Sequence, residues 1–315
     1  MQRVIIDTDP GIDDTAAIFF ALGSGAVKVE ALTTVFGNAE VEQCTRNALM
    51  VLEVAGRTDI PVHPGAARPL VRDPTYAKMI HGDNGLGNVE FAPPHASPSA
   101  TRAVEAIITR VMSAPGEIML IALGPLTNVA LALAAEPRLA SHLRSLILMG
   151  GAVLTWGNVT PAASANLFND PEAARAVYRA GAPLVQVGLD VCRPTVITRS
   201  HLDRLRSVKT APAEFLMRIM PFIQDAYRKA GIKAIEGGGV QFNDVPCIAY
   251  AIRPDLFGTR RLFVDVETQG ALTTGETVAD FDGRWGKAPN VDVCLEVNAL
   301  GVADLFADVL TQWRV

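Results

Sequence analysis

VIIDTDPGIDDT, at residues 4–15, joins a short apolar run to a turn that holds four aspartates. The apolar residues 4–6 predict a buried strand, and residues 15–22 predict the helix that follows it. In an open α/β sheet, ligands bind beyond the carboxyl ends of the strands. We therefore expect the four carboxylates, those of Asp7, Asp9, Asp13 and Asp14, to lie at a binding site.

Four carboxylates this close together repel one another, and a bound cation would relieve the repulsion. A single aspartate that caps the helix would stabilise it by about 1 kcal/mol, but one cap accounts for one aspartate only. Oxygen-only clusters select hard cations such as Ca²⁺ or Mg²⁺. Two enzyme classes fit: a metal-assisted hydrolase, and a phosphoryl transferase of the haloacid-dehalogenase type with Asp7 as nucleophile and Asp9 as acid/base.

Short apolar runs alternate with longer helix-like runs along the chain, which is typical of a largely parallel sheet covered by helices on both faces. The expected strands are residues 4–6, 29–35, 118–122, 146–149 and 184–187. The expected helices are residues 15–22, 41–55, 103–112, 128–135 and 171–179. No composition shift resembles a linker, so we expect one α/β domain over residues 1–315.

Three segments rich in Gly, Pro or polar residues interrupt this rhythm: residues 64–98, 150–169 and 229–241. Long segments without clear structure inside a compact domain are usually functional loops. We expect them to contribute to the site, and the third, which contains GGG, to be mobile.

Composition narrows the function class. The 28 basic and 33 acidic residues give a net charge of −5, so there is no basic excess with which to bind nucleic acid. Apolar stretches are broken well before the roughly 18 residues that a membrane span needs, and acidic residues stand where a secretory signal would be apolar. We expect a cytoplasmic protein. The four cysteines lack zinc-site spacing and are expected to be reduced thiols.

Several blocks together resemble the inosine-uridine-type nucleoside hydrolases, over nearly the whole chain and in that family's order. The blocks are DTDPGIDDTAA (7–17), TTVFGN (33–38), HGDNGLGN (81–88), LGPLTN (123–128), GNVTP (157–161), Asn166, DPEAA (170–174) and ND (243–244). They displace the phosphatase interpretation.

The resemblance implies an open α/β fold with a mainly parallel, mixed sheet and a tightly bound Ca²⁺. It implies cleavage of the N-glycosidic bond of small-molecule ribonucleosides by water, which gives ribose and a free base. It also implies a homo-oligomer, either a dimer or a tetramer.

The same resemblance assigns roles to individual residues. The Ca²⁺ ligands would be Asp9, Asp14 and Asp244 through their carboxylates and Thr127 through its backbone carbonyl. Asp9 would also be the general base for the metal-bound water. The ribose hydroxyls would be held by Asp13, Asn38, Asn158 and Asn166. Because a site built on such hydrogen bonds leaves polar groups unpaired when a hydroxyl is missing, we expect ribonucleosides to be preferred over 2′-deoxyribonucleosides.

Two positions depart from the family pattern. Asn243 stands where many members have a His near the leaving base, and an amide cannot deliver a proton. Ser164 stands where a Glu is expected to receive the ribose 5′-hydroxyl. The substrate is therefore either a plain ribonucleoside or another N-riboside, such as a 5′-modified one, and a third alternative is a riboside-binding protein with weakened catalysis.

Without a His at position 243, the leaving base needs another partner. The candidates are His81, as a catalytic residue, or an aromatic side chain that stacks on the base. These aromatic candidates are Trp156, Phe222 and Tyr227.

Overall fold

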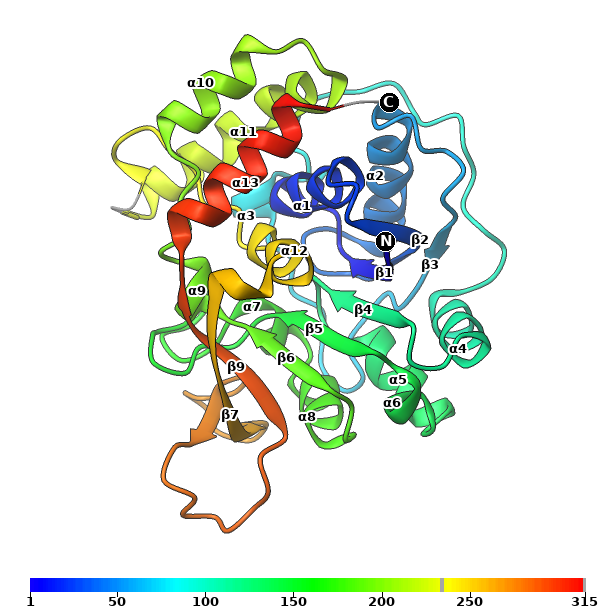
Figure 1. Ribbon diagram of the computed structural model, residues 1–315, viewed down its shortest axis with the longest axis vertical. Helices are drawn as coiled ribbons and strands as arrows, with labels where there is room; N and C mark the ends of the chain where they lie inside the picture. The colour runs from blue at the N-terminus through cyan, green and yellow to red at the C-terminus, as the bar shows by residue number, and fades with distance from the viewer. Residues whose placement is uncertain (233–234, 314–315) are drawn as a thin grey trace.

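A computed structural model describes residues 1–232 and 235–313. Within these residues, one nine-stranded sheet has the order β3-β2-β1-β4-β5-β6-β9-β7-β8 (Figure 1). Strands β1 to β6 and β9 are parallel, whereas β7 is antiparallel to both of its neighbours. The strands are β1 (Gln2–Thr8), β2 (Val27–Thr34), β3 (Val62–Pro64), β4 (Ile118–Ala122), β5 (Ser145–Met149), β6 (Leu184–Val187), β7 (Phe257–Val266), β8 (Thr277–Asp280) and β9 (Val291–Val297).

Helices cover both faces of this sheet. One group lies on one face, and its members are α1 (Ile12–Gly23), α2 (Val41–Val54), α10 (Arg199–Ser207), α11 (Ala211–Lys229), α12 (Val245–Ile252) and α13 (Ala299–Thr311). The other face carries α4 (Ala103–Ser113), α5 (Thr127–Ala135), α6 (Leu139–His142) and α8 (Pro171–Arg179). The remaining short helices are α3 (Lys78–His81), α7 (Ala165–Asn169), α9 (Leu189–Cys192) and η2 (Pro254–Leu256).

Alternating side chains of the central strands feed two separate cores. In β1, Val4 and Ile6 belong to one apolar cluster, while Ile5 belongs to the other. This alternation follows from the two-residue period of a strand, and burial on both faces is why the strand is apolar without interruption. The predicted mainly parallel α/β fold is therefore confirmed.

The boundaries differ from the prediction where polar residues take part in regular structure. Strand β1 extends to Thr8 because Asp7 and Thr8 still pair with β2. Helix α1 begins at Ile12 rather than at residue 15, because the Gly11 N–H donates to Asp14 Oδ2 at 3.0 Å and so caps the helix.

The three predicted loops carry little regular structure. Residues 64–98 contain the last residue of β3 and the short helix α3, and residues 150–169 contain only α7. In the third segment, Lys229 ends α11 and Val240 pairs with Ile197, and the expected mobility of this segment falls partly on residues 233–234, outside the described residues.

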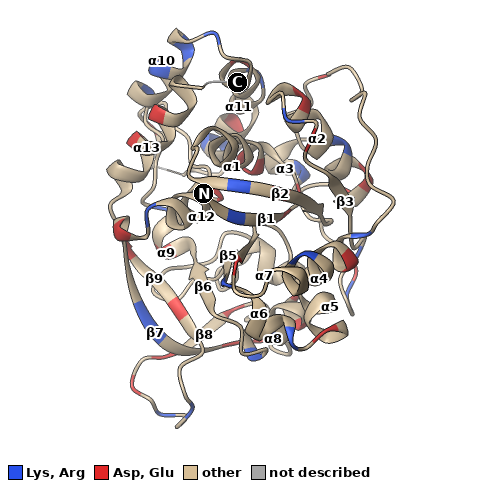
Figure 2. Cartoon of the chain, turned by 45° about the vertical axis from the view of Figure 1, so that its right-hand side comes forward, with Lys and Arg blue, Asp and Glu red and all other residues tan. Residues whose placement is uncertain are grey.

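The outer helices carry interspersed basic and acidic residues (Figure 2). None of the described helices combines the length and the apolar character needed to cross a membrane.

Candidate active site

The four aspartates at the end of β1 and in the turn after it do not all lie in the same cavity. Asp7 points away from the site: its Oδ1 accepts hydrogen bonds from Thr33 Oγ1 at 2.5 Å and Asn128 Nδ2 at 2.8 Å. Burial raises the pKa of Asp7 to about 7, although these two hydrogen bonds lower it, and its Oδ2 has no partner among the residues that the structure describes. Asp7 therefore joins β1 to β2 and α5, and it is not placed to act as a phosphatase nucleophile.

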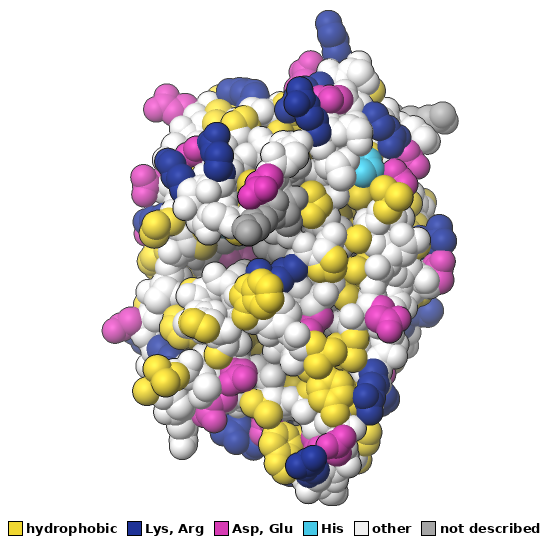
Figure 3. Space-filling model, turned by 90° about the vertical axis from the view of Figure 1, so that its left-hand side faces the viewer, with side chains coloured by type: hydrophobic (Ala, Val, Ile, Leu, Met, Phe, Trp, Pro, Cys, Tyr) yellow, Lys and Arg dark blue, Asp and Glu magenta, His cyan; other side chains and the backbone are white. Residues whose placement is uncertain are grey.

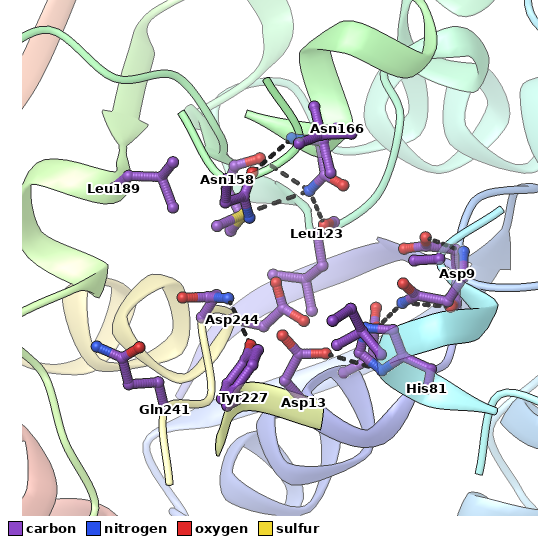
Figure 4. A pocket seen from close by; sticks show the side chains of 18 of the residues that line it. Asp9, Asp13, His81, Leu123, Asn158, Asn166, Leu189, Tyr227, Gln241 and Asp244 are labelled. Atoms are coloured by element: carbon purple, nitrogen blue, oxygen red, sulfur yellow. Dashed lines mark hydrogen bonds and ion pairs between the residues drawn. The ribbon is translucent and has the colours of Figure 1, made fainter. Parts of the chain in front are cut away.

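The other three aspartates of the turn, Asp9, Asp13 and Asp14, line a cavity of about 240 Å³ at the carboxyl ends of the parallel strands (Figure 4). Most of the residues expected at the site line the same cavity. They are Asn38, His81, Asn158, Asn166, Asn243 and Asp244.

Three buried carboxylates converge on one point of this cavity. Oxygens of Asp13, Asp14 and Asp244 all lie within 4.8 Å of one another. Burial, followed by the charges of neighbouring aspartates, raises the pKa of Asp244 well above its usual value, and burial raises that of Asp13 to about 6. Such a cluster fits a hard cation, because the cation supplies the positive charge that the carboxylates lack.

Asp9 is packed against two glycine-containing loops. The Asn38 N–H donates to Asp9 Oδ2 at 2.8 Å, and a side chain at Gly37 or Gly124 would overlap the Asp9 carboxylate. Burial, and then the charge of Asp14, raises the pKa of Asp9 well above its usual value. Only glycine therefore fits at positions 37 and 124 while the Asp9 carboxylate keeps its place.

His81 lies beside the carboxylates but is neutral. Its Nδ1 accepts a hydrogen bond from the Ile12 N–H at 3.2 Å and lies 3.8 Å from Asp13 Oδ1. Burial lowers the pKa of His81 to about 4, against the charge of Asp14. Because Nδ1 accepts, we assign the ring proton to Nε2, so this group can donate a hydrogen bond at neutral pH but is not an imidazolium acid.

The three asparagines differ in how much hydrogen-bonding capacity remains. Asn38 Nδ2 donates to Asp14 Oδ2 at 2.8 Å, so this amide orients a carboxylate. Asn166 Nδ2 donates to the carbonyl oxygens of Leu123 and Met149. Asn158 Oδ1 accepts from the Ala165 N–H at 2.8 Å, which leaves its NH₂ for a ligand.

Thr127 does not line the cavity, contrary to the prediction. It lies in the first turn of α5, buried, and its hydroxyl donates to Asp170 Oδ2 at 2.6 Å. The cavity is lined instead by Leu123, directly after β4 ends at Ala122. The residue next to the strand end reaches the site, whereas a residue four positions later is already in the helix.

Ser164 is also absent from the cavity lining. It is 1% exposed, and its hydroxyl accepts from the Gly151 N–H at 2.7 Å. Its side chain therefore closes a loop next to α7 and is not available to a ribose 5′-hydroxyl.

Asn243, which the resemblance places near the leaving base, has its Nδ2 at 3.3 Å from the Tyr227 hydroxyl, and both residues line the cavity. The other aromatic candidates do not line it: Trp156 is exposed, and Phe222 packs against the core beside Gly87. Two lining residues, Arg193 and Gln241, were not anticipated, because no local motif marks them.

Comparison with known proteins agrees with this geometry. The family model described as inosine-uridine preferring nucleoside hydrolase matches residues 4–304. The chain is 40% identical over 320 residues to a probable uridine nucleosidase 2 of Arabidopsis thaliana, covering 99% of this chain and 98% of that protein. It is 39% identical over 307 residues to the non-specific ribonucleoside hydrolase RihC of Escherichia coli O157:H7, covering 98% and 97%.

Solved structures agree as well. A plant nucleoside hydrolase, PpNRh1, superposes with a TM-score of 0.94 at 36% identity, covering 99% of both chains. A purine-preferring ribonucleoside hydrolase from Gardnerella vaginalis gives 0.92 at 31% identity, covering 98% of both chains. With matches of this extent, the chain belongs to the inosine-uridine preferring nucleoside hydrolase family.

Proposed function

We infer that this protein hydrolyses the N-glycosidic bond of ribonucleosides to ribose and free base. The observation that carries the inference is the convergence of Asp13, Asp14 and Asp244 in a cavity whose other lining residues include Asp9 and four asparagines. This combination suits a sugar with two neighbouring hydroxyls, because carboxylates accept hydrogen bonds from hydroxyls and amides both donate and accept.

The cation that we propose for this cavity is Ca²⁺. Of the three converging carboxylates it would take those of Asp14 and Asp244, together with that of Asp9, which lines the same cavity but is not one of the three. Asp9, Asp14 and Asp244 would hold it through carboxylate oxygens, and the backbone carbonyl of Leu123 replaces that of Thr127 in our proposed ligand set. All of these ligands are oxygens, as Ca²⁺ requires. When bound, Ca²⁺ supplies a Lewis acid that lowers the pKa of a water and orients the ribose diol.

The residues of the chain then have separate tasks. Asp9 accepts the proton of the attacking water, and Asp13 accepts a hydrogen bond from a ribose hydroxyl. Positive charge develops on the ribose ring as the base departs, and the surrounding carboxylates stabilise it electrostatically. Asn158 and Asn166 hydrogen-bond to the ribose and so hold it beside these carboxylates.

The departing base receives no proton from Asn243, because an amide carries none to give. His81 can donate a hydrogen bond from Nε2, and we propose that it orients the base in this way. Asn243 also favours a second candidate function, in which the protein binds ribosides without efficient turnover.

A reducing-sugar assay separates the two functions. The protein is incubated with uridine, inosine, cytidine, adenosine and guanosine in the presence of Ca²⁺. We expect release of ribose from at least one of them, while binding of a riboside by calorimetry with no sugar release would establish the second candidate instead.

We further propose a single domain over residues 1–315 that forms a dimer or tetramer in the cytoplasm and acts in nucleoside salvage. Light scattering coupled to size-exclusion chromatography tests the assembly, and a monomeric mass would contradict it.

A further inference from the structure

Arg193, which directly follows α9, lines the cavity, and its side chain contacts a neighbouring loop. Its guanidinium lies 4.7 Å from the centre of the Trp156 ring, and its Nη2 donates to the backbone carbonyls of Trp156 at 3.1 Å and Gly157 at 2.5 Å. A guanidinium suits this arrangement because it stacks on a ring and donates hydrogen bonds at the same time. Figure 3 shows the hollowed face of the molecule, where basic and hydrophobic side chains border a recess.

The segment that Arg193 contacts connects β5 to α7 and contains Asn158. We call residues 150–164 the sugar loop. It has no helix or strand of its own, and the side chains of Leu154 and Trp156 are 68% and 65% exposed. A loop with so little apolar burial depends for its position on the hydrogen bonds that its backbone makes with other segments.

Asp190 and Arg193 hold different parts of the sugar loop. Asp190 accepts from the N–H groups of Val153 at 3.0 Å and Leu154 at 2.7 Å. Its charge also lies near the guanidinium and opposes the lowering of the Arg193 pKa by burial. Because the carboxylate takes N–H groups in the first half of the loop, the guanidinium is the group that fixes the two carbonyls directly before Asn158.

Asn158 itself lies in a tight turn at the end of the sugar loop. The Asn158 N–H donates to the Ala163 carbonyl at 3.1 Å, and Asn158 Oδ1 accepts from the Ala165 N–H at 2.8 Å. These hydrogen bonds join the turn to the start of α7, whereas Arg193 holds the part of the loop that comes from β5. The backbone of Asn158 is therefore anchored on both sides, and Arg193 is one of the two anchors.

The place of this amide matters for a bound sugar. Figure 4 shows Asn158 on one side of the cavity, with Asp13 and Asp244 on the other. An amide on that side reaches a ribose only if the backbone that carries it is fixed. A misplacement of about 1 Å, even from a change remote from the reacting atoms, can lower a rate by about 10²-fold.

The backbone around Arg193 is joined to a second segment of the site. Gln241 Nε2 donates to the Arg193 carbonyl, and the Cys192 thiol donates to the Asn243 carbonyl at 3.2 Å. Neither contact uses the Arg193 side chain, so both survive its replacement. A substitution at this position should therefore loosen the sugar loop and leave the segment around Asn243 in place.

We propose that Arg193 is a positioning residue that fixes Asn158 beside the ribose. The proposal rests on the function inferred above and names how one of its sugar contacts is held. Arg193 acts on the backbone of Trp156 and Gly157, and through that backbone on the Asn158 amide, without contact with the substrate.

A double-mutant cycle tests this link. Release of the base from the favoured ribonucleoside is measured for the wild type, Arg193→Gln, Asn158→Ala and the double variant, with Arg193→Lys as the conservative replacement. Arg218→Gln is the matched control. Arg218 also lies over a ring, that of Phe91 at 4.4 Å, but it does not line the cavity.

We expect Arg193→Gln to lower kcat/KM by about tenfold or more. Arg193→Lys should restore part of this loss, because an ammonium group still donates to carbonyls and lies over a ring. In the Asn158→Ala background, Arg193→Gln should lower kcat/KM by less than about threefold, since the contact that it positions is already absent. Arg218→Gln should change kcat/KM by less than about twofold.

Hydrogen exchange followed by mass spectrometry gives a second readout that needs no substrate. In Arg193→Gln, the amides of residues 151–160 should exchange faster than in the wild type, because one anchor of the sugar loop is lost. The amides of residues 241–245 should exchange at the wild-type rate, because that segment is held by contacts that the substitution leaves intact.

Equal losses of kcat/KM from Arg193→Gln with and without Asn158 would show that Arg193 acts independently of this amide and would overturn the proposal. Unchanged exchange in residues 151–160 would overturn it too, and faster exchange that extends to residues 241–245 would make Arg193 a general structural residue instead. If the wild type releases no base from any ribonucleoside, the proposed function fails on its own. The same cycle is then measured on the affinity for ribose by calorimetry, where equal losses, or no affinity to lose, would overturn the positioning role.

Discussion

Two regions of the molecule differ in how they balance the charge of a carboxylate: the buried site, and the antiparallel edge of the sheet. On the edge, Asp265 contacts Arg179 at 2.5 Å and Arg175 at 3.5 Å. Burial opposes its ionisation, but the hydrogen bond from Arg179 and the backbone of Val266 lower the pKa of Asp265. At the site, no arginine of residues 1–232 and 235–313 forms an ion pair with Asp13, whose one such contact is with neutral His81, and burial raises the pKa of Asp13 to about 6. The chain itself supplies positive partners for the carboxylate at the edge, whereas the carboxylates of the site need a bound cation.

The largest expected effect is the difference in kcat between a substitution of Asp9, at the site, and the same substitution of Asp265, at the edge. We expect Asp9→Asn to lower kcat on ribonucleosides by roughly 10³-fold or more, because the substitution removes both a proton acceptor and a proposed cation ligand. Steady-state kinetics with the favoured nucleoside measures it, and Asp265→Asn is the control that should keep kcat within about twofold. A decrease in kcat of less than tenfold in Asp9→Asn would contradict the functional difference that we infer between the two regions.

The next effect concerns the sugar. If a 2′,3′-diol completes the carboxylate cluster, 2′-deoxyuridine leaves Asp13 and the asparagines unpaired. We expect kcat/KM for 2′-deoxyuridine to be about 10²-fold or more below that for uridine. Equal values for the two sugars would show that the cluster does not bind the diol.

A smaller effect is visible in stability against pH. The pKa values of Asp7 and Asp13, about 7 and about 6 in the folded chain, lie above the value of about 3.9 for an unfolded chain. Between roughly pH 4 and pH 7 these two groups hold more protons in the folded metal-free protein than in the unfolded one. His81, whose pKa is lowered to about 4, holds fewer, but one group does not outweigh two, so the stability decreases as the pH rises through this window.

Thermal unfolding in a chelator should accordingly give a higher Tm at pH 5 than at pH 8. Added Ca²⁺ should raise the Tm more at pH 8, because the cation competes with protons for the same carboxylates. A calcium effect that is equal at both pH values would contradict the proposed site.

The smallest effect belongs to the edge. Arg179→Gln removes a partner of Asp265 whose side chain is half exposed, and such pairs contribute about 0–1 kcal/mol. Chemical denaturation should show a loss within this range, the same with and without Ca²⁺. A calcium-dependent loss would mean that the two regions are coupled.

The sequence sufficed for those parts of the molecule in which neighbouring residues act together. The apolar run, the turn and the aspartates of residues 4–15 form β1, the site and α1 in direct succession. The order of the sheet was not readable, because β9 inserts between β6 and β7 through contacts remote in sequence.

The site residues that were misplaced or missed share a physical reason. A backbone carbonyl such as that of Leu123 has no side-chain signature, so Thr127 was chosen from its motif. The burial of Ser164 depends on Gly151, and the place of Arg193 depends on Gly157, which is 36 residues away. Such contacts exist only after the loops have packed on the sheet.

The central claim is that the carboxylates of Asp9, Asp14 and Asp244 hold a divalent cation. Calorimetric titration of the chelator-treated protein with CaCl₂ tests it most directly, with Asp244→Asn alongside. We predict one Ca²⁺ per chain for the wild type and a loss of this binding in the variant, whereas a folded wild-type protein that takes up no Ca²⁺ even at millimolar concentration would contradict the claim.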